Sequence, residues 1–251
     1  MPARHAPARR PLEVVAAKGC VTARILGRGR SARLDAEAAG RLIELIEEVE
    51  DDESARMLAI TGSGSAFCTG FAPDVNPAVV ESLAVLSKPT LAIVNGDAID
   101  EGLELAMAAD IRVSVASARF ALTQLGRDEL PHFGGTQRLP RLVGAGHALR
   151  MLLAGAAIDG SEAHRIGLVA YLAKNERDLG RVAGSVVESI LSRAPLAARL
   201  VKDAVLKGYD MTLEQGVRLE EDLYALLQTT ADRAEGVRAF LEKRKPLFRG
   251  A

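Results

Sequence analysis

The sequence of 251 residues predicts an α/β fold, and two observations carry that prediction. First, short apolar runs, such as those at 57–61 and 90–94, alternate with longer segments whose apolar residues recur at helical spacing. Second, short turns join the runs to the helical segments, as in strand–turn–helix units. This alternation by itself favours a doubly wound sheet.

Each element is expected from its own local pattern. The first two strands are apolar runs on either side of the Lys18-Gly19 turn. The first helix follows Asp35, a favourable N-cap, and carries a buried stripe at i, i+3, i+4 and i+7 formed by Leu42, Leu45, Ile46 and Val49. In chain order we expect strands at 12–15 and 21–26, a helix from 35 to about 50, a strand at 57–61, a helix around 77–86, a strand at 90–94, a helix from near 101, a strand at 111–115, and helices from about 180 onward.

Length and composition indicate one globular domain with a helical extension. The chain has 48% hydrophobic and 26% charged residues, as ordinary soluble proteins do. We expect a core at 12–190 and a C-terminal helical region at 191–251. Residues 1–11 carry arginine without acid but lack the amphipathic pattern of a transit peptide, so we expect a disordered tail there.

Charge and cysteine content argue against several classes of function. With 32 basic and 33 acidic residues the net charge is −1, so no global field favours nucleic acid or an anionic membrane. No apolar run approaches the roughly 20 residues needed to span a bilayer. Four scattered histidines and two distant cysteines, Cys20 and Cys68, show no metal-ligand spacing and no disulfide framework. We therefore expect a cytoplasmic protein without a metal.

Two turns rich in small residues carry the strongest functional signal. The segment 98–106 opens an apolar helix and places the carboxylate of Glu104 just inside its first turn. The segment 66–71 comes directly after the apolar run at 57–61. Backbone N–H groups at two such turns can converge on one carbonyl oxygen and stabilise negative charge that develops there.

Together with four further segments, these turns resemble the crotonase family, the enoyl-CoA hydratases and isomerases, from about residue 12 to residue 250. The further segments are 89–96, 109–113, 134–144 and 167–169. The resemblance implies a spiral of ββα repeats in place of a doubly wound sheet. It also implies an acyl-CoA substrate, no additional cofactor, and C-terminal helices that pack the chain into a homotrimer or a hexamer. The leucine stripe at 219, 223 and 226 either makes that contact or closes the chain's own core.

The resemblance places Glu104 and Gln124 where family hydratases have the two glutamates that hold and activate water. Glu104 lies between Leu103 and Leu105, and burying a carboxylate there would be costly without a purpose, so we interpret it as the acid–base residue. The alternative is an exposed glutamate on a helix face. Gln124 can orient a water molecule but cannot exchange a proton at neutral pH. A two-carboxylate mechanism therefore cannot be carried over intact.

The two oxyanion-hole donors of the family match the N–H groups of Phe71 and Glu101. The family usually has consecutive glycines where this chain has Asp100-Glu101, and a carboxylate there would repel an enolate unless its side chain turns to solvent. We interpret Asp100 as an N-cap and Glu101 as the first helical residue. The alternative is that one of them is a second catalytic carboxylate. His132 is a further candidate for the missing acid–base group, against an incidental loop histidine.

Coenzyme and acyl contacts are assigned by position in the family pattern. Family members hold the CoA phosphates with scattered basic side chains and the adenine between apolar groups. The segment 70–88 is shorter than its usual counterpart, which indicates a more open acyl pocket or one completed by a neighbouring subunit. The candidates are Arg28, Arg30, Arg33, Gly70, Ala72 and Gly102, together with Tyr224, Phe240 and Lys243 from the tail of the same or an adjacent subunit.

The sequence leaves three hypotheses for the function. The first is an enoyl-CoA hydratase with an altered site, and the second is an isomerase or decarboxylase that uses one carboxylate. The third is a homologue that binds acyl-CoA with little catalysis, which Gln124 and the Asp100-Glu101 pair motivate. RNA binding, which one branch of the family shows, is disfavoured by the net charge of −1 and the acidic end of the first helix.

Overall fold

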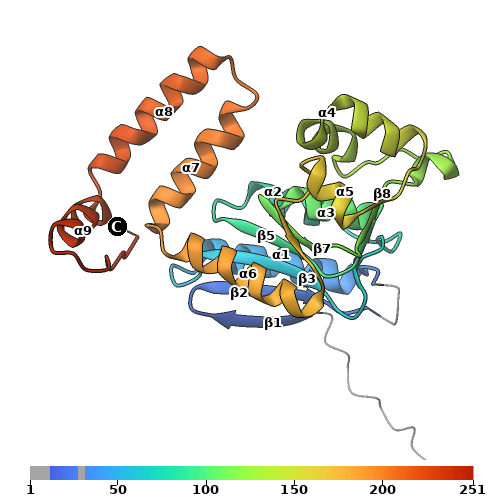
Figure 1. Ribbon diagram of the computed structural model, residues 1–251, viewed down its shortest axis with the longest axis horizontal. Helices are drawn as coiled ribbons and strands as arrows, with labels where there is room; N and C mark the ends of the chain where they lie inside the picture. The colour runs from blue at the N-terminus through green and yellow to red at the C-terminus, as the bar shows by residue number, and fades with distance from the viewer. Residues whose placement is uncertain (1–11, 28–31, 251) are drawn as a thin grey trace, which may run out of the picture.

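The computed structural model describes residues 12–27 and 32–250, and its strands form two sheets (Figure 1). The larger sheet has the order β1-β2-β3-β5-β7-β10, and its neighbours run parallel except for the antiparallel pair β1–β2. Its strands are β1 (Leu12–Ala17), β2 (Cys20–Ile25), β3 (Met57–Gly62), β5 (Thr90–Val94), β7 (Ile111–Val115) and β10 (Tyr171–Ala173). The smaller sheet, in the order β4-β6-β8-β9, consists of β4 (Ala66–Cys68), β6 (Asp97–Ile99), β8 (Arg119–Ala121) and β9 (Ile158–Asp159).

The two sheets are built by a repeated unit of the chain. A strand of the larger sheet is followed by a short strand of the smaller sheet and then by a helix, as in β3-β4-α2 and β5-β6-α3. The fold class is therefore α/β with the expected spiral of ββα repeats, and the doubly wound alternative is wrong. The described helices are α1 (Ala36–Asp51), α2 (Ala78–Val85), α3 (Glu101–Ala108), α4 (Gly135–Leu153, broken at Gly144), α5 (Gly160–Arg165), α6 (Glu176–Leu191), α7 (Pro195–Gly208), α8 (Leu213–Gln228) and α9 (Ala231–Leu241), with a 3-10 turn, η1, at Gln124–Arg127.

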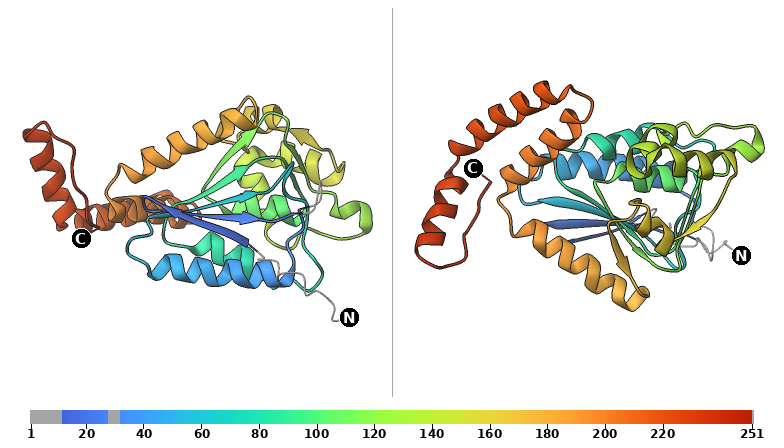
Figure 2. Two further views of the ribbon diagram at one scale, coloured as in Figure 1. Left: turned by 90° about the horizontal axis from the view of Figure 1, so that it is seen from below. Right: turned by 45° about the horizontal axis from the view of Figure 1, so that its top comes forward.

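The core lies between the larger sheet and the helices on its two faces. Helix α1 covers one face and α6 the other, as the left view of Figure 2 shows. The Asp35 carboxylate accepts a hydrogen bond from the Ala38 N–H at 2.8 Å, so the predicted N-cap of α1 is confirmed. The four apolar residues of its predicted stripe are all buried, and every residue of β3 is buried as well.

The C-terminal helices stand apart from this core (Figure 1). Helices α7 and α8 contain no fully buried residue. Of the predicted leucine stripe, Leu219 and Leu223 are half-buried and Leu226 is exposed, and none belongs to the hydrophobic core. In the part of the chain that the structure describes, the stripe therefore does not close the chain's own core. None of the helices described is long and apolar enough to cross a membrane.

The sequence pattern missed the short strands of the smaller sheet, and it also gave no sign of η1, α4, α5 or β10. We predicted turns at 66–71 and 98–101, and the structure shows that each begins with a strand, β4 or β6. Strands of three residues are too short to display an apolar period. The smaller sheet matters for the site because β4 ends just before Gly70-Phe71 and β6 ends just before Asp100-Glu101.

Candidate functional site

Glu104 lies in the first turns of α3, and its side chain is completely buried. Its Oε1 accepts hydrogen bonds from the backbone N–H groups of Phe133 at 2.9 Å and Gly135 at 2.7 Å. These donors come from the loop before α4 and from the first residue of that helix. The alternative of an exposed glutamate on a helix face is therefore wrong. The carboxylate is held in one orientation by backbone groups that cannot rotate away.

Burial raises the pKa of Glu104, because a charged carboxylate loses its hydration there. The two N–H donors stabilise the charged form and act in the opposite direction, as does the charge of His132. The desolvation effect is the largest, so the pKa of Glu104 stays above its ordinary value. A carboxyl group with a raised pKa is suited to give and take a proton closer to neutral pH.

Gln124 is brought against Glu104 by η1, as the resemblance implied. Its Nε2 donates a hydrogen bond to Glu104 Oε2 at 3.3 Å, and the residue is 1% exposed. Its Oε1 is buried and accepts no hydrogen bond from the residues that the structure describes. A buried amide oxygen of this kind is an acceptor that an O–H donor, such as the hydroxyl of a water molecule, can satisfy.

The Phe71 N–H, the first predicted oxyanion-hole donor, is engaged by the protein itself. It donates to the Glu101 Oε2 at 3.3 Å. The Glu101 side chain therefore turns toward the Phe71 N–H and not to solvent, and its carboxylate occupies one of the two predicted donors. Gly70 makes this approach possible, since an added Cβ would lie 3.0 Å from that oxygen and the φ angle of +128° favours glycine. Arg33 Nη2 donates to the Phe71 carbonyl oxygen, which belongs to the next peptide group, between Phe71 and Ala72.

Asp100 occupies the N-cap position of α3, as expected, but its side chain does not cap the helix. The carboxylate accepts hydrogen bonds from the Thr123 hydroxyl at 3.0 Å and the Thr123 N–H, and it pairs with Arg127 at 3.1 Å. The residue has a φ of +51°, which is uncommon for a residue with a side chain. Asp100 thus ties the start of α3 to the segment that carries Gln124.

A cavity of about 830 Å³ opens beside these groups. Its wall includes the predicted residues Arg33, Gly70, Phe71, Ala72, Asp100, Glu101 and His132. Glu104 and Gln124 do not line it, but Phe133, whose N–H holds Glu104, does. The Phe133 ring packs edge-on against the Phe71 ring at 5.2 Å and beside the His132 ring at 4.2 Å. The cavity and the buried carboxylate are therefore adjacent.

The remaining predicted contact residues lie away from the cavity or outside the residues that the structure describes. Gly102 is buried against β4, where an added Cβ would be 1.9 Å from the Cys68 carbonyl oxygen, and it does not line the cavity. Tyr224 and Phe240, on α8 and α9, are exposed at 62% and 82%, and neither they nor Lys243 line the cavity of their own chain. Arg28 and Arg30, and the tail predicted at 1–11, lie outside the described residues.

Sequence reasoning missed the groups that orient the site. The N–H groups of Phe133 and Gly135 hold Glu104, and Arg127 pairs with Asp100. Gly135 lies in the segment 134–144 that carries the resemblance, and the structure shows why a glycine suits it, since a Cβ there would lie 2.9 Å from Glu104 Oε1. Every residue except proline has a backbone N–H, so the residue type does not reveal which of these groups donates to a side chain.

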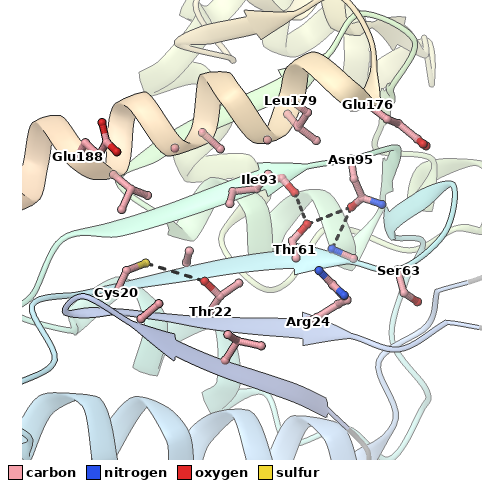
Figure 3. Close-up of a pocket in the computed structure, with 18 of the residues that line it drawn as sticks. Cys20, Thr22, Arg24, Thr61, Ser63, Ile93, Asn95, Glu176, Leu179 and Glu188 are labelled. Atoms are coloured by element: carbon pink, nitrogen blue, oxygen red, sulfur yellow. Dashed lines mark hydrogen bonds between the residues drawn. The ribbon is translucent and has the colours of Figure 1, made fainter.

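A second cavity, of about 740 Å³, lies between α6 and the larger sheet and shares no lining residue with the first (Figure 3). Two of its polar side chains, Thr61 and Asn95, bond to the backbone. Thr61 Oγ1 donates to the Ile93 carbonyl oxygen at 2.9 Å, and Asn95 Oδ1 accepts from the Gly62 N–H at 2.9 Å. None of the predicted site residues lies in this cavity.

Comparison with known proteins identifies the family. The family model described as enoyl-CoA hydratase/isomerase matches residues 30–251. The chain is 37% identical over 233 residues to the (E)-benzylidenesuccinyl-CoA hydratase of Thauera aromatica, covering 87% of this chain and 91% of the relative. It is 38% identical over 221 residues to the crotonyl-CoA hydratase of Syntrophomonas wolfei, covering 82% and 85%. A crystal structure of an enoyl-CoA hydratase from Bacillus anthracis superposes with a TM-score of 0.92 at 31% identity, over 96% of this chain and 100% of the other. The chain belongs to the enoyl-CoA hydratase/isomerase family, the crotonases.

Proposed function

We propose that the protein hydrates the double bond of an enoyl-CoA thioester, with Glu104 as its acid–base residue and Gln124 as the group that orients the water. The observation that carries this proposal is the buried Glu104 carboxylate, with Oε1 held by two N–H groups and Oε2 next to the Gln124 amide. The names of the relatives, which include two hydratases of CoA thioesters, support the same reaction class.

The proposed reaction divides the work between these two side chains. The water oxygen bonds to the β carbon of the substrate while its proton passes to the Glu104 carboxylate, and negative charge develops on the thioester oxygen. The N–H groups of Phe71 and Glu101 are the donors proposed to stabilise that charge. Glu104 then returns a proton to the α carbon, so that one carboxyl group serves both steps.

The experiment that tests this function is hydration of crotonyl-CoA by the purified protein. We expect loss of the enoyl-thioester absorbance and formation of 3-hydroxybutyryl-CoA. An aromatic and a dicarboxylic enoyl-CoA should be tested beside it, because the relatives act on differing acyl groups. Absence of turnover with all three substrates, while the protein is folded, would refute the hydratase proposal.

A second candidate is a homologue that binds acyl-CoA with little catalysis. Two observations favour it: an amide, Gln124, stands beside Glu104, and the Glu101 carboxylate occupies the Phe71 N–H. Calorimetry with an acyl-CoA beside the hydration assay distinguishes the two candidates, because a binder shows affinity for acyl-CoA without turnover. In the hydration assay, isomerisation or decarboxylation would give products other than the 3-hydroxyacyl-CoA.

We further propose that the protein assembles as a trimer or as a pair of trimers. The large apolar side chains exposed on the C-terminal helices support this assembly, and they include Val201, Val205, Leu206, Leu213 and Val217. An apolar surface of this kind is typical of a protein interface. Light scattering is expected to show a mass of three or six chains. A monomer of 26.6 kDa would contradict the proposal and would exclude Tyr224 and Lys243 as contacts to a neighbour's coenzyme.

A further inference from the structure

We propose that Glu101 gates the oxyanion hole: its carboxylate competes with the substrate for the Phe71 N–H, and only a thioester that displaces it can be activated. This inference rests on the proposed function, because it concerns how the same site accepts its substrate. It is carried by the 3.3 Å hydrogen bond from the Phe71 N–H to Glu101 Oε2.

The local structure is built to accept this contact. Glu101 is the first residue of α3, so its position is set by the end of β6 and the start of the helix. Gly70 leaves the space that the carboxylate enters, since a Cβ there would lie 3.0 Å from Oε2 and 3.9 Å from Arg33 Nε. Arg33 also donates to the Phe71 carbonyl oxygen, so the peptide that follows the donor is held as well.

Carboxylate and thioester oxygen cannot both use the Phe71 donor. One N–H group has one hydrogen, and a second acceptor on it weakens both bonds. A carboxylate left beside an enolate oxygen would also destabilise the developing charge, because like charges a few ångströms apart repel strongly in a partly buried site. The Glu101 N–H, by contrast, donates no hydrogen bond within the residues that the structure describes. The Glu101 N–H is therefore available to a substrate oxygen, whereas the Phe71 N–H is already bonded to the Glu101 carboxylate.

This competition weakens the binding of a ligand only if the ligand carries a carbonyl oxygen. A ligand that carries a carbonyl oxygen must break the contact between Glu101 and Phe71, whereas a thioether of the same length leaves it in place. Removing the carboxylate should therefore strengthen binding of the thioester selectively. If only the loss of a negative charge mattered, binding of both ligands would be strengthened equally, because both carry the CoA phosphates.

The test compares butyryl-CoA, a saturated thioester, with S-butyl-CoA, the thioether that lacks the carbonyl oxygen. Calorimetry is performed on the wild type, Glu101→Ala, Glu101→Gln and the control Asp74→Asn. Asp74 is exposed in the same loop as Phe71 and does not line the cavity, so its variant removes one negative charge without opening the donor. Circular dichroism establishes that each variant is folded.

In Glu101→Ala we expect the Kd of butyryl-CoA to fall by about tenfold relative to that of S-butyl-CoA, because a hydrogen bond to a charged group is removed from the competing state. Glu101→Gln should show a smaller shift in the same direction, since a neutral amide oxygen is the weaker acceptor. Asp74→Asn should leave the ratio of the two Kd values unchanged. If Glu101→Ala does not fold, the glutamine variant decides the question.

Two results would overturn the gate. One is an unchanged ratio of the two Kd values in both Glu101 variants. The other is that Glu101 proves to assist the substrate, seen in either variant as weaker binding of butyryl-CoA with or without a loss of kcat on crotonyl-CoA. If neither the wild type nor any variant binds either CoA compound, the proposed function itself fails and the gate fails with it.

Discussion

Replacing Glu104 with glutamine is expected to lower kcat on crotonyl-CoA by about 10²–10⁴ while affinity for butyryl-CoA changes little. Glutamine keeps an acceptor oxygen for the N–H groups of Phe133 and Gly135, and its amide nitrogen replaces the Oε2 acceptor, so the Gln124 amide must turn its oxygen toward it. What the variant loses is the ability to exchange a proton. Steady-state kinetics and calorimetry on the same preparation measure the two effects separately.

The same substitution is expected to stabilise the fold near neutral pH. Burial raises the pKa of Glu104 in the folded state above its value in the unfolded chain, so the folded state holds the proton more tightly. The corresponding stability is fully present below the unfolded pKa of about 4.3 and is lost as pH rises through the folded pKa. Glutamine has no such loss, so the free energy of unfolding of the variant should rise relative to that of the wild type from about pH 4 up to the folded pKa of Glu104, and the difference should stay constant above it.

A control on the surface separates these effects from a general change in charge. Glu47→Gln makes the same replacement on the exposed side of α1, away from the site, and should alter neither kcat nor the pH dependence of stability. If Glu104→Gln turned over crotonyl-CoA at the wild-type rate, Glu104 would not be the acid–base residue. A second carboxylate at the cavity would then have to be sought.

Replacing Gln124 with glutamate is expected to raise kcat on crotonyl-CoA by about 10², because it adds a second group that can exchange protons. The Gln124 Nε2 lies 3.3 Å from Glu104 Oε2, so the new carboxyl group would stand next to the first in a buried site. Two carboxylates this close cannot both ionise easily, and the pKa of one of them rises. That group remains protonated and can supply the proton for the α carbon while its partner accepts one from water.

The gain in rate should come with a loss of stability at neutral pH. The buried pair retains a proton that the unfolded chain releases, so the free energy of unfolding falls as pH rises, more steeply than in the wild type. Chemical denaturation at several pH values measures this, and Gln137→Glu, on the exposed side of α4, is the matched control. An unchanged or lower kcat in a folded Gln124→Glu variant would contradict the role assigned to position 124 and would favour a reaction that needs only one carboxylate.

Local patterns in the sequence were enough for the elements that bury a regular apolar face. The strands at 90–94 and 111–115 and the N-cap at Asp35 were predicted as they are found. The three-residue strands β4, β6, β8 and β10 were not, because so short a segment is defined by its partner strand and not by its own residues. The spiral of repeats was expected only from the resemblance, since the repeating unit has no repeated residues.

For the site, the sequence by itself determined which side chains are present: a carboxylate at 104, an amide at 124, and the Asp100-Glu101 pair where the family usually has glycines. Only the tertiary structure decided what those groups do. It placed the N–H groups of Phe133 and Gly135 on Glu104, and it turned Glu101 toward the Phe71 N–H instead of toward solvent. The physical reason is that these partners are backbone groups about 30 residues away in the chain, and their positions depend on how strands and helices pack. The residue type fixes the chemistry of a side chain, whereas its orientation depends on neighbours that no local sequence pattern specifies.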